Sequence, residues 1–185
     1  MAEHRSMQRA ALLDAARSLL SEGGTEALTF PALAERTGLA RSSVYEYFRS
    51  RAAVVEELCA VDFPVWAAEV AAAMGAAEGA EAKVEAYVRR QLALVGDRRH
   101  RAVVAISASE LDAGAREKIR AAHGELVAMI GEALEEMGHS EPRLAAMLLQ
   151  GVVDAAVRRI ELGAAEDPAA ITEAAVTMAL RGVRG

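Results

Sequence analysis

The stretch "LAERTGLARSSVYEYFRSR", residues 33–51, gathers aromatic and basic side chains in a chain that has few aromatic residues. It holds two of the three Tyr, one of the three Phe and four Arg. Residues 36–51 carry four Arg against one acid, Glu46, although the whole chain has a net charge of −6. The positive charge is therefore local, and it coincides with the aromatic residues.

Helix signals place this stretch in a helix, a tight turn and a second helix. Thr29 suits the N-cap of a helix that ends at Gly38, because its hydroxyl accepts a hydrogen bond from the first turn. The turn "GLA" leads into "RSSVYEYF", where Val44 and Phe48 are four residues apart and share a buried face. Ser50 then caps a further helix. The sequence predicts a helix-turn-helix.

The second helix of a helix-turn-helix lies in the major groove of DNA, with its N-terminal residues nearest the bases. Arg forms two hydrogen bonds to guanine, the small Ser can hydrogen-bond to different bases, and Tyr reaches phosphates or thymine methyl groups. Helix N-termini with a nearby cation or hydroxyl hold phosphates. The predicted DNA-binding residues are therefore Thr29, Arg41, Ser42, Ser43, Tyr45, Tyr47 and Arg51.

The longer stretch "LTFPALAERTGLARSSVYEYFRSRAAVVEEL" resembles the DNA-binding signature of the TetR family of bacterial repressors. The resemblance covers about residues 8–60, and its matching residues are Gly38, Leu39, Tyr45, Tyr47, Phe48 and Arg51. It implies an all-helical homodimer that represses transcription and leaves DNA when a small molecule binds its larger C-terminal domain. By position, Arg41 and Ser42 are the expected base readers, whereas the other five predicted residues hold phosphates or groove edges.

Three residues depart from the family pattern. Ala40 stands where the family often has Ser or Thr, so the second helix lacks a side-chain cap, at a cost of about 1 kcal/mol. Arg51 replaces the usual Lys, which keeps the charge and changes the geometry. Glu46 places an acid near phosphates, and we expect it to point away from the duplex or to accept a hydrogen bond from cytosine N4.

The chain as a whole is expected to be all-α, with about nine helices. Hydrophobic residues make up 53% of the chain, many of them Ala, and there are only four Pro. We expect a three-helix DNA-binding domain over residues 1–51 and a ligand-binding and dimerisation domain over 52–185, linked by the fourth helix. Pro64 is expected to interrupt that fourth helix or to start a new segment. Further helices are predicted over residues 83–96, 102–111, 115–137, 142–162 and from 168 onward.

The last two predicted helices are rich in apolar residues on more than one face, so that a lone chain would leave one face of each exposed. Pairing them with a second copy would bury those faces in a four-helix bundle. A twofold dimer also places two recognition helices one DNA turn apart, roughly 34–36 Å, on a palindromic operator. The alternative is that both helices pack inside the monomer.

Few large or polar side chains are available for an effector pocket in the remaining helices. Trp66 either stacks on a ligand or fills the core. Tyr87 and Gln91 are four residues apart and share a face, although Gln91 is equally suited to solvent. The Ala-rich helices suggest an apolar effector, or simply tight packing. The predicted ligand-binding residues are Trp66, Tyr87, Gln91, Ser107, His123 and Arg158.

A basic cluster, "GDRRHR" at residues 96–101, opens one of the central helices. One hypothesis pairs Arg98, Arg99 or Arg101 with acids near Glu22, Glu56 or Glu57, which would couple the pocket to the recognition helices. The alternative is a solvated run of charge.

Other classes of protein find little support in the sequence. No phosphate-binding Gly-rich loop and no hydrolase or metalloprotease motif occurs, and the four His are scattered, so we expect no catalytic residue, metal or cofactor. The single Cys, Cys59, is expected to be a small core residue. No stretch is expected to span a membrane, and no signal peptide is recognised, so a cytoplasmic protein is expected.

The alternative function is a helical ligand-binding or adaptor protein that does not bind DNA; the effector and the operator sequence cannot be inferred.

Overall fold

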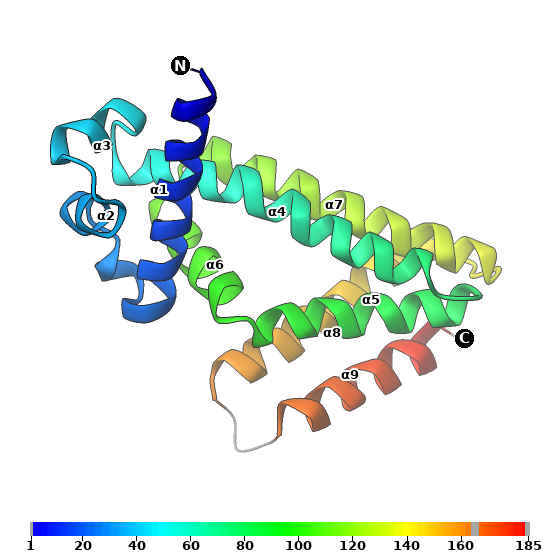
Figure 1. The fold of residues 1–185 in the computed structure, drawn as a ribbon. Helices are drawn as coiled ribbons and strands as arrows, with labels where there is room; N and C mark the ends of the chain where they lie inside the picture. The colour runs from blue at the N-terminus through cyan, green and yellow to red at the C-terminus, as the bar shows by residue number, and fades with distance from the viewer. Residues whose placement is uncertain (1, 164–166, 184–185) are drawn as a thin grey trace. The chain divides into compact units, whose positions relative to one another are not determined.

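The structure, a computed structural model, describes residues 2–163 and 167–183, apart from the side chains of residues 2, 118, 120, 122 and 123. The described residues are all-α, as the sequence predicts, and no strand occurs among them (Figure 1). The helices are α1 (Ala2–Gly23), the 3-10 helix η1 (Thr25–Ala27), α2 (Phe30–Thr37), α3 (Arg41–Tyr47), α4 (Arg51–Gly75), α5 (Ala80–Gly96), α6 (Arg98–Glu110), α7 (Ala113–Glu136), α8 (Pro142–Glu161) and α9 (Pro168–Val183).

The chain divides into two compact units. Unit 1 comprises Met1–Phe63 and Asp97–Ile119, and therefore contains α1 to α3, the first half of α4, and α6. Unit 2 comprises Pro64–Gly96 and Arg120–Gly185, and contains the second half of α4, α5, most of α7, α8 and α9. The division falls inside α4, between Phe63 and Pro64.

The core of unit 1 forms where the apolar periodicity predicts it. Val44 and Phe48 from α3 and its C-cap are 0% and 2% exposed, and Leu33 of α2 and Leu58 of α4 are also buried. Cys59 is a core residue as expected, and its burial raises the pKa of its thiol to about 12. On α4, Leu58 is buried, whereas Val61, which follows it at helical spacing, is 43% exposed.

The expected interruption at Pro64 is wrong, because α4 continues through this residue from Arg51 to Gly75. A proline inside a helix removes one backbone hydrogen bond and crowds the preceding turn. The turns on both sides are fixed by buried side chains, Val55 and Leu58 before the proline and Val70 and Met74 after it. Tertiary packing therefore outweighs the local cost.

The expectation that no stretch is long and apolar enough to cross a membrane also needs correction. By length and composition alone, α4 meets that criterion. Core helices of soluble proteins meet the same criterion, so a single such helix is weak evidence of a membrane span. Its first half buries Val54 and Val55 in the core of unit 1, and its Asp62 forms an ion pair with Arg17 of α1.

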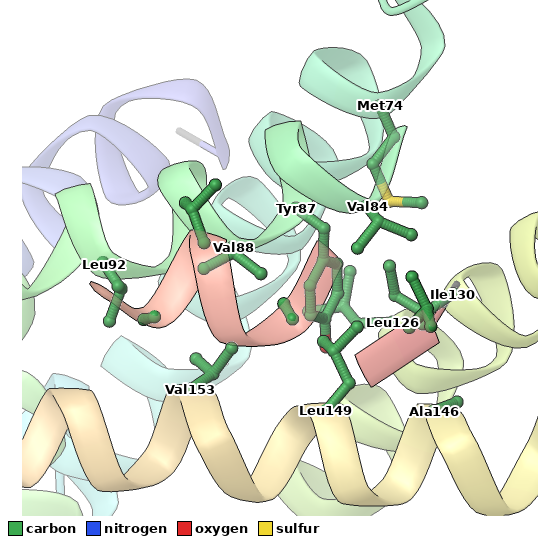
Figure 2. Packing of buried hydrophobic residues seen from close by; sticks show 14 of the residues in the cluster. Met74, Val84, Tyr87, Val88, Leu92, Leu126, Ile130, Ala146, Leu149 and Val153 are labelled. Atoms are coloured by element: carbon green, nitrogen blue, oxygen red, sulfur yellow. The ribbon is translucent and has the colours of Figure 1, made fainter. Parts of the chain in front are cut away.

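The core of unit 2 is formed by one apolar cluster that α5, α7, α8 and α9 share with the end of α4. Helix α9 contacts both α5 and α8, and α5 also contacts α8. Figure 2 shows the ring of Tyr87 among Val84 of α5 and Leu149 of α8. On α8 the buried positions form a single stripe, which consists of Ala146, Leu149, Val153 and Ala156.

Candidate nucleic-acid interface

Local capping and turn chemistry position α2 and α3. The hydroxyl of Thr29 accepts a hydrogen bond of 3.3 Å from the backbone N–H of Ala32, as predicted for an N-cap. Gly38 ends α2 in the left-handed conformation with φ of 68°, which a residue without a side chain adopts at little cost. Ala40 precedes α3 without any side-chain cap, as expected. Ser50 caps α4 by accepting from Ala53 N–H at 3.1 Å.

The buried side of α3 leaves its polar side chains at the surface. Because Val44 is fully buried, Arg41, Ser42 and Tyr45 are exposed, and Ser43 is half-buried. The ring of Tyr45 remains 55% exposed although it packs 4.5 Å from the ring of Phe30 at the start of α2. This surface presents a cation, two hydroxyls and a phenol from one short helix.

Tyr47 lies at the other end of α3 and contacts α1. Its side chain is half-buried, and its hydroxyl donates a hydrogen bond to the side-chain carbonyl of Gln8. The guanidinium of Arg5 lies 5.7 Å from the centre of the Tyr47 ring, and it donates at 3.5 Å to the backbone carbonyl of Glu46. Sequence reasoning missed Arg5 and Gln8, because no local pattern indicates that the start of α1 meets α3.

Besides Tyr47, two more of the side chains predicted to hold phosphates have partners inside unit 1. The Thr29 hydroxyl serves as the cap of α2. The guanidinium of Arg51 donates a 2.5 Å hydrogen bond from Nη2 to the carbonyl oxygen of Thr25 in η1. Its Nε lies 3.5 Å from Oε1 of Glu110, the last residue of α6.

Carboxylates neutralise four of the seven arginines in α1 to α4. The hydrogen bonds from Arg9 lower the pKa of Glu57, and those from Arg36 lower the pKa of Glu22. The four pairs are Arg9–Glu57, Arg17–Asp62, Arg36–Glu22 and Arg51–Glu110. Within the described part of these helices and their connections, Arg5, Arg41 and Arg49 have no carboxylate partner, and all three are exposed. They lie before, within and directly after the sequence that forms the surface of α3.

The predicted coupling cluster at the start of α6 is also engaged in unit 1. Arg98 donates a 2.8 Å hydrogen bond to the carbonyl oxygen of Ser21 in α1. The pKa of Glu22 is lowered first by the hydrogen bond from Arg36 and to a lesser extent by the nearby charge of Arg98. Asp97 caps α6 by accepting from the backbone N–H of Arg99 at 2.7 Å. A role in coupling remains a hypothesis.

Two of the predicted ligand-binding residues meet in unit 2. The buried hydroxyl of Tyr87 donates a hydrogen bond to the side-chain oxygen of Gln150 on α8, and Gln91 donates to the same oxygen at 3.2 Å. The side-chain N–H of Gln150 in turn donates to Asp154 at 2.8 Å. Burial raises the pKa of Tyr87, so its phenol stays protonated. Sequence reasoning missed Gln150 and Asp154, although their spacing of four on a mostly apolar helix was a usable signal.

Of the other four predicted ligand-binding residues, neither Ser107 nor Arg158 hydrogen-bonds to this cluster within the described part of the chain. Trp66 is half-buried on α4, and Arg158 is exposed on α8. Ser107 is buried in unit 1, where its hydroxyl donates to the carbonyl of Val104 within α6 at 2.7 Å. The side chain of His123 lies outside the described residues.

An apolar surface covers the outward side of α8 and α9. Met147, Leu148 and Met178 are 67%, 65% and 62% exposed, and Leu144 is 48% exposed. A groove of about 250 Å³ opens between the two helices, and Leu144, Leu148, Val152 and Met178 contribute to its lining. Both helices therefore contribute to the core with one stripe and leave a second apolar stripe uncovered within this chain.

Several solved structures with this fold are transcriptional regulators. The structure is similar to that of a transcriptional regulator from Streptomyces coelicolor that belongs to the TetR family, with 20% identity, a TM-score of 0.77, and 97% of each chain covered. It is also similar to AibR in complex with isovaleryl coenzyme A and operator DNA, with 16% identity, a TM-score of 0.71, and 92% of this chain and 97% of that one covered. A third similar structure is a regulator from Saccharomonospora viridis in complex with choline, with 15% identity, a TM-score of 0.83, and 94% and 95% covered.

The sequence comparison places the match in the region of the candidate interface. Residues 12–58 match the model for bacterial regulatory proteins of the tetR family. No sequence among curated proteins matches the chain. Residues 12–58 therefore form the region that this chain shares with bacterial regulatory proteins of the tetR family, within a fold that the solved regulators also have.

Proposed function

We propose that the protein is a ligand-responsive transcriptional repressor that binds a palindromic operator as a homodimer. The observation that carries the proposal is the set of exposed arginines without carboxylate partners, Arg5, Arg41 and Arg49, around the surface of α3. In a protein with a net charge of −6, a local basic surface fits a polyanionic partner. TetR-family regulators are in general transcription factors without enzymatic activity, and we propose no enzymatic activity.

In this proposal, base reading falls to Arg41 and Ser42 at the N-terminal end of α3. Ser43, Tyr45 and Tyr47 contact groove edges or phosphates, together with the helix N-termini that follow Thr29 and Ser50. We assign DNA binding to residues 1–51, with 52–185 for effector binding and dimerisation, and we place the protein in the cytoplasm.

Dimerisation through α8 and α9 is supported by the exposed apolar stripe. Burial of Met147, Leu148 and Met178 against a second copy removes a large apolar surface from water. The same stripe on two copies is self-complementary, as a twofold interface requires. The expected interface is a four-helix bundle of two α8 and two α9 helices.

The polar cluster in unit 2 supports a neutral effector with a hydrogen-bonding group on an otherwise apolar body. Tyr87, Gln91 and Gln150 offer neutral donors and acceptors in apolar surroundings. The basic side chains of α5 are already engaged, since Lys83, Arg89 and Arg90 each pair with a carboxylate. This composition is unlike a site for a strongly anionic group. AibR was solved with isovaleryl coenzyme A and the S. viridis regulator with choline, so members of this fold accept chemically different ligands.

The test is a footprint of the purified protein on DNA upstream of its own gene, followed by selection from genomic fragments if that DNA is not protected. Arg41→Ala should raise the protein concentration needed for protection by about 30-fold, and binding should weaken steeply as salt rises. Arg116→Ala serves as a matched control, because it removes an exposed arginine from α7, outside α3 and the proposed dimer helices, and should leave protection intact. The absence of any sequence-specific, salt-sensitive binding would favour the alternative, a helical ligand-binding or adaptor protein.

The operator obtained in this way then reports on effectors. Neutral apolar compounds that carry a hydroxyl or carbonyl group should release the DNA, whereas acyl-coenzyme A thioesters should not. Tyr87→Phe should weaken the response to an active compound and leave operator affinity unchanged, because only the phenol that bonds to Gln150 is lost. Release by acyl-coenzyme A alone would contradict the assignment of a neutral effector.

A further inference from the structure

The first residue of α4, Arg51, directs its charge into unit 1. Its Nη2 donates to the carbonyl oxygen of Thr25, and its Nε lies 3.5 Å from Oε1 of Glu110. The side chains of Arg51 and Glu110 are only 29% and 28% exposed. The Nε is buried and has no hydrogen-bond partner among the described residues.

The contact with Glu110 is the loosest of the four arginine–carboxylate pairs in α1 to α4. Arg9–Glu57 and Arg36–Glu22 close at 2.7 Å, and Arg17–Asp62 closes at 2.5 Å. A distance of 3.5 Å keeps the Coulomb attraction but exceeds the range of a normal N–H···O hydrogen bond. Because the Nε is buried where it lies, the guanidinium gains this bond only if it turns toward a better acceptor at the surface.

A phosphate at the start of α4 is such an acceptor. Arg51 is separated from α3 by only Phe48, Arg49 and Ser50, so it follows directly after the proposed recognition helix. The backbone N–H groups in the first turn of α4 favour an anion at the same end. A guanidinium also binds phosphate through two parallel hydrogen bonds, which the present contact with Glu110 does not provide.

We propose that Glu110 is a positioning residue that withholds Arg51 from DNA. In the free protein the Glu110 carboxylate and the Thr25 carbonyl hold the guanidinium, and on binding a phosphate replaces Glu110 as its partner. The inference rests on the proposed DNA-binding function and deepens it. Glu110 on α6 thereby lowers operator affinity, although it does not itself contact DNA.

The test is a double-mutant cycle measured by fluorescence anisotropy over a salt series, on the selected operator and on a random-sequence duplex. Glu110→Gln should bind both duplexes more tightly, by about tenfold at about 100 mM salt, with little change in the salt slope, because Arg51 contacts a phosphate in the wild-type complex as well; Arg51→Gln should lower that slope by about 0.9 per protomer, as the loss of one phosphate contact requires. Arg51→Gln should remove the whole gain, so that Glu110→Gln has no effect in the Arg51→Gln background. Glu56→Gln is the matched control, because it removes an exposed acid from α4 that is not the partner of Arg51 and should leave the affinity for both duplexes nearly unchanged.

Equal or weaker binding by Glu110→Gln would overturn the proposal and show that the pair only orients α4. Thermal unfolding is recorded for each protein. If Glu110→Gln unfolds at the assay temperature, Glu110→Asp takes its place, because it keeps the charge, draws the carboxylate back by one methylene and should give a smaller gain of the same sign. If the wild-type protein and all variants bind neither duplex, the proposed function fails together with this inference. That result differs from failure of this inference alone, in which the wild-type protein binds DNA and Glu110→Gln binds no more tightly.

Discussion

The two ends of the chain leave different kinds of surface without a partner. Around α3 in unit 1, exposed arginines have no carboxylate partner among the described residues, whereas on α8 and α9 of unit 2 methionine and leucine side chains remain exposed to solvent. On α5 of unit 2, by contrast, the basic side chains are neutralised, as the bonds from Arg89 to Glu85 and Glu173 illustrate. An exposed basic surface is complementary to a polyanion, and an exposed apolar surface is complementary to another apolar surface. The difference assigns separate partners to the two regions.

The largest expected effect comes from placing charge on the apolar stripe of unit 2. Leu148→Glu combined with Met178→Glu should convert the proposed dimer to a monomer, because a carboxylate would then be buried at the proposed twofold interface. Operator affinity should fall by about 100-fold or more, since the second half-site no longer adds to the first. Sedimentation velocity and anisotropy measure the two effects.

The matched control for that variant is Ala93→Glu, which adds a charge to an exposed position on α5 and should change neither property. A monomeric wild-type protein, or a charged variant that stays dimeric, would show that the exposed apolar stripe of α8 and α9 is not a dimer interface.

A second prediction concerns the largely buried ion pair between Arg17 and Asp62 in unit 1. Asp62→Asn should lower the free energy of unfolding by about 3 kcal/mol, because Asp62 and its partner Arg17 are largely buried and the guanidinium would lose its main acceptor. Arg17 keeps a contact with the exposed Asp14, which tempers the loss. Urea unfolding followed by circular dichroism measures the change.

Glu22→Gln provides the contrast for Asp62→Asn. It breaks the exposed pair with Arg36, and surface ion pairs contribute little to stability. Equal losses from the two variants would show that burial does not set the value of these pairs.

The third prediction separates base reading from phosphate binding within the unpaired arginines. Arg41→Ala should weaken operator binding by about 2 kcal/mol and relax the base preference at one position of each half-site, whereas Arg49→Ala should weaken binding to all sequences alike. Selection of bound sequences from a randomised operator distinguishes the two outcomes. The same loss of base preference in both variants would contradict the assignment of Arg41.

The sequence predicts what depends on local chemistry, and it misses what depends on distant partners. The cap at Thr29, the turn at Gly38 and the buried pair Val44 and Phe48 follow from spacing, and the structure confirms them. The contact of Arg51 with Glu110 joins residues that are far apart in the chain, so no local pattern indicates it, and the predicted phosphate contact of Arg51 stays a prediction. Continuity of α4 through Pro64 was missed for the same reason, because packing on both sides of the proline is tertiary.

A similar limit applies in unit 2. The shared face of Tyr87 and Gln91 follows from helical spacing, but their common acceptor, Gln150, comes from another helix. The exposed stripe on α8 and α9 was predictable from composition, because two helices with more than one apolar face exceed what one small core can cover.

The smallest predicted effect comes from adding a side-chain cap to α3, which has none. Ala40→Ser supplies the missing side-chain acceptor at the start of α3 and should raise the free energy of unfolding by about 1 kcal/mol. Ala11→Ser is the control, since serine at an exposed position inside α1 should lower stability by a few tenths of a kcal/mol, roughly. If operator affinity stays constant while stability rises, α3 is already formed before DNA binds. A parallel gain in affinity would show instead that α3 frays in the free protein and that DNA orders it, so that part of the binding free energy is used to complete the helix.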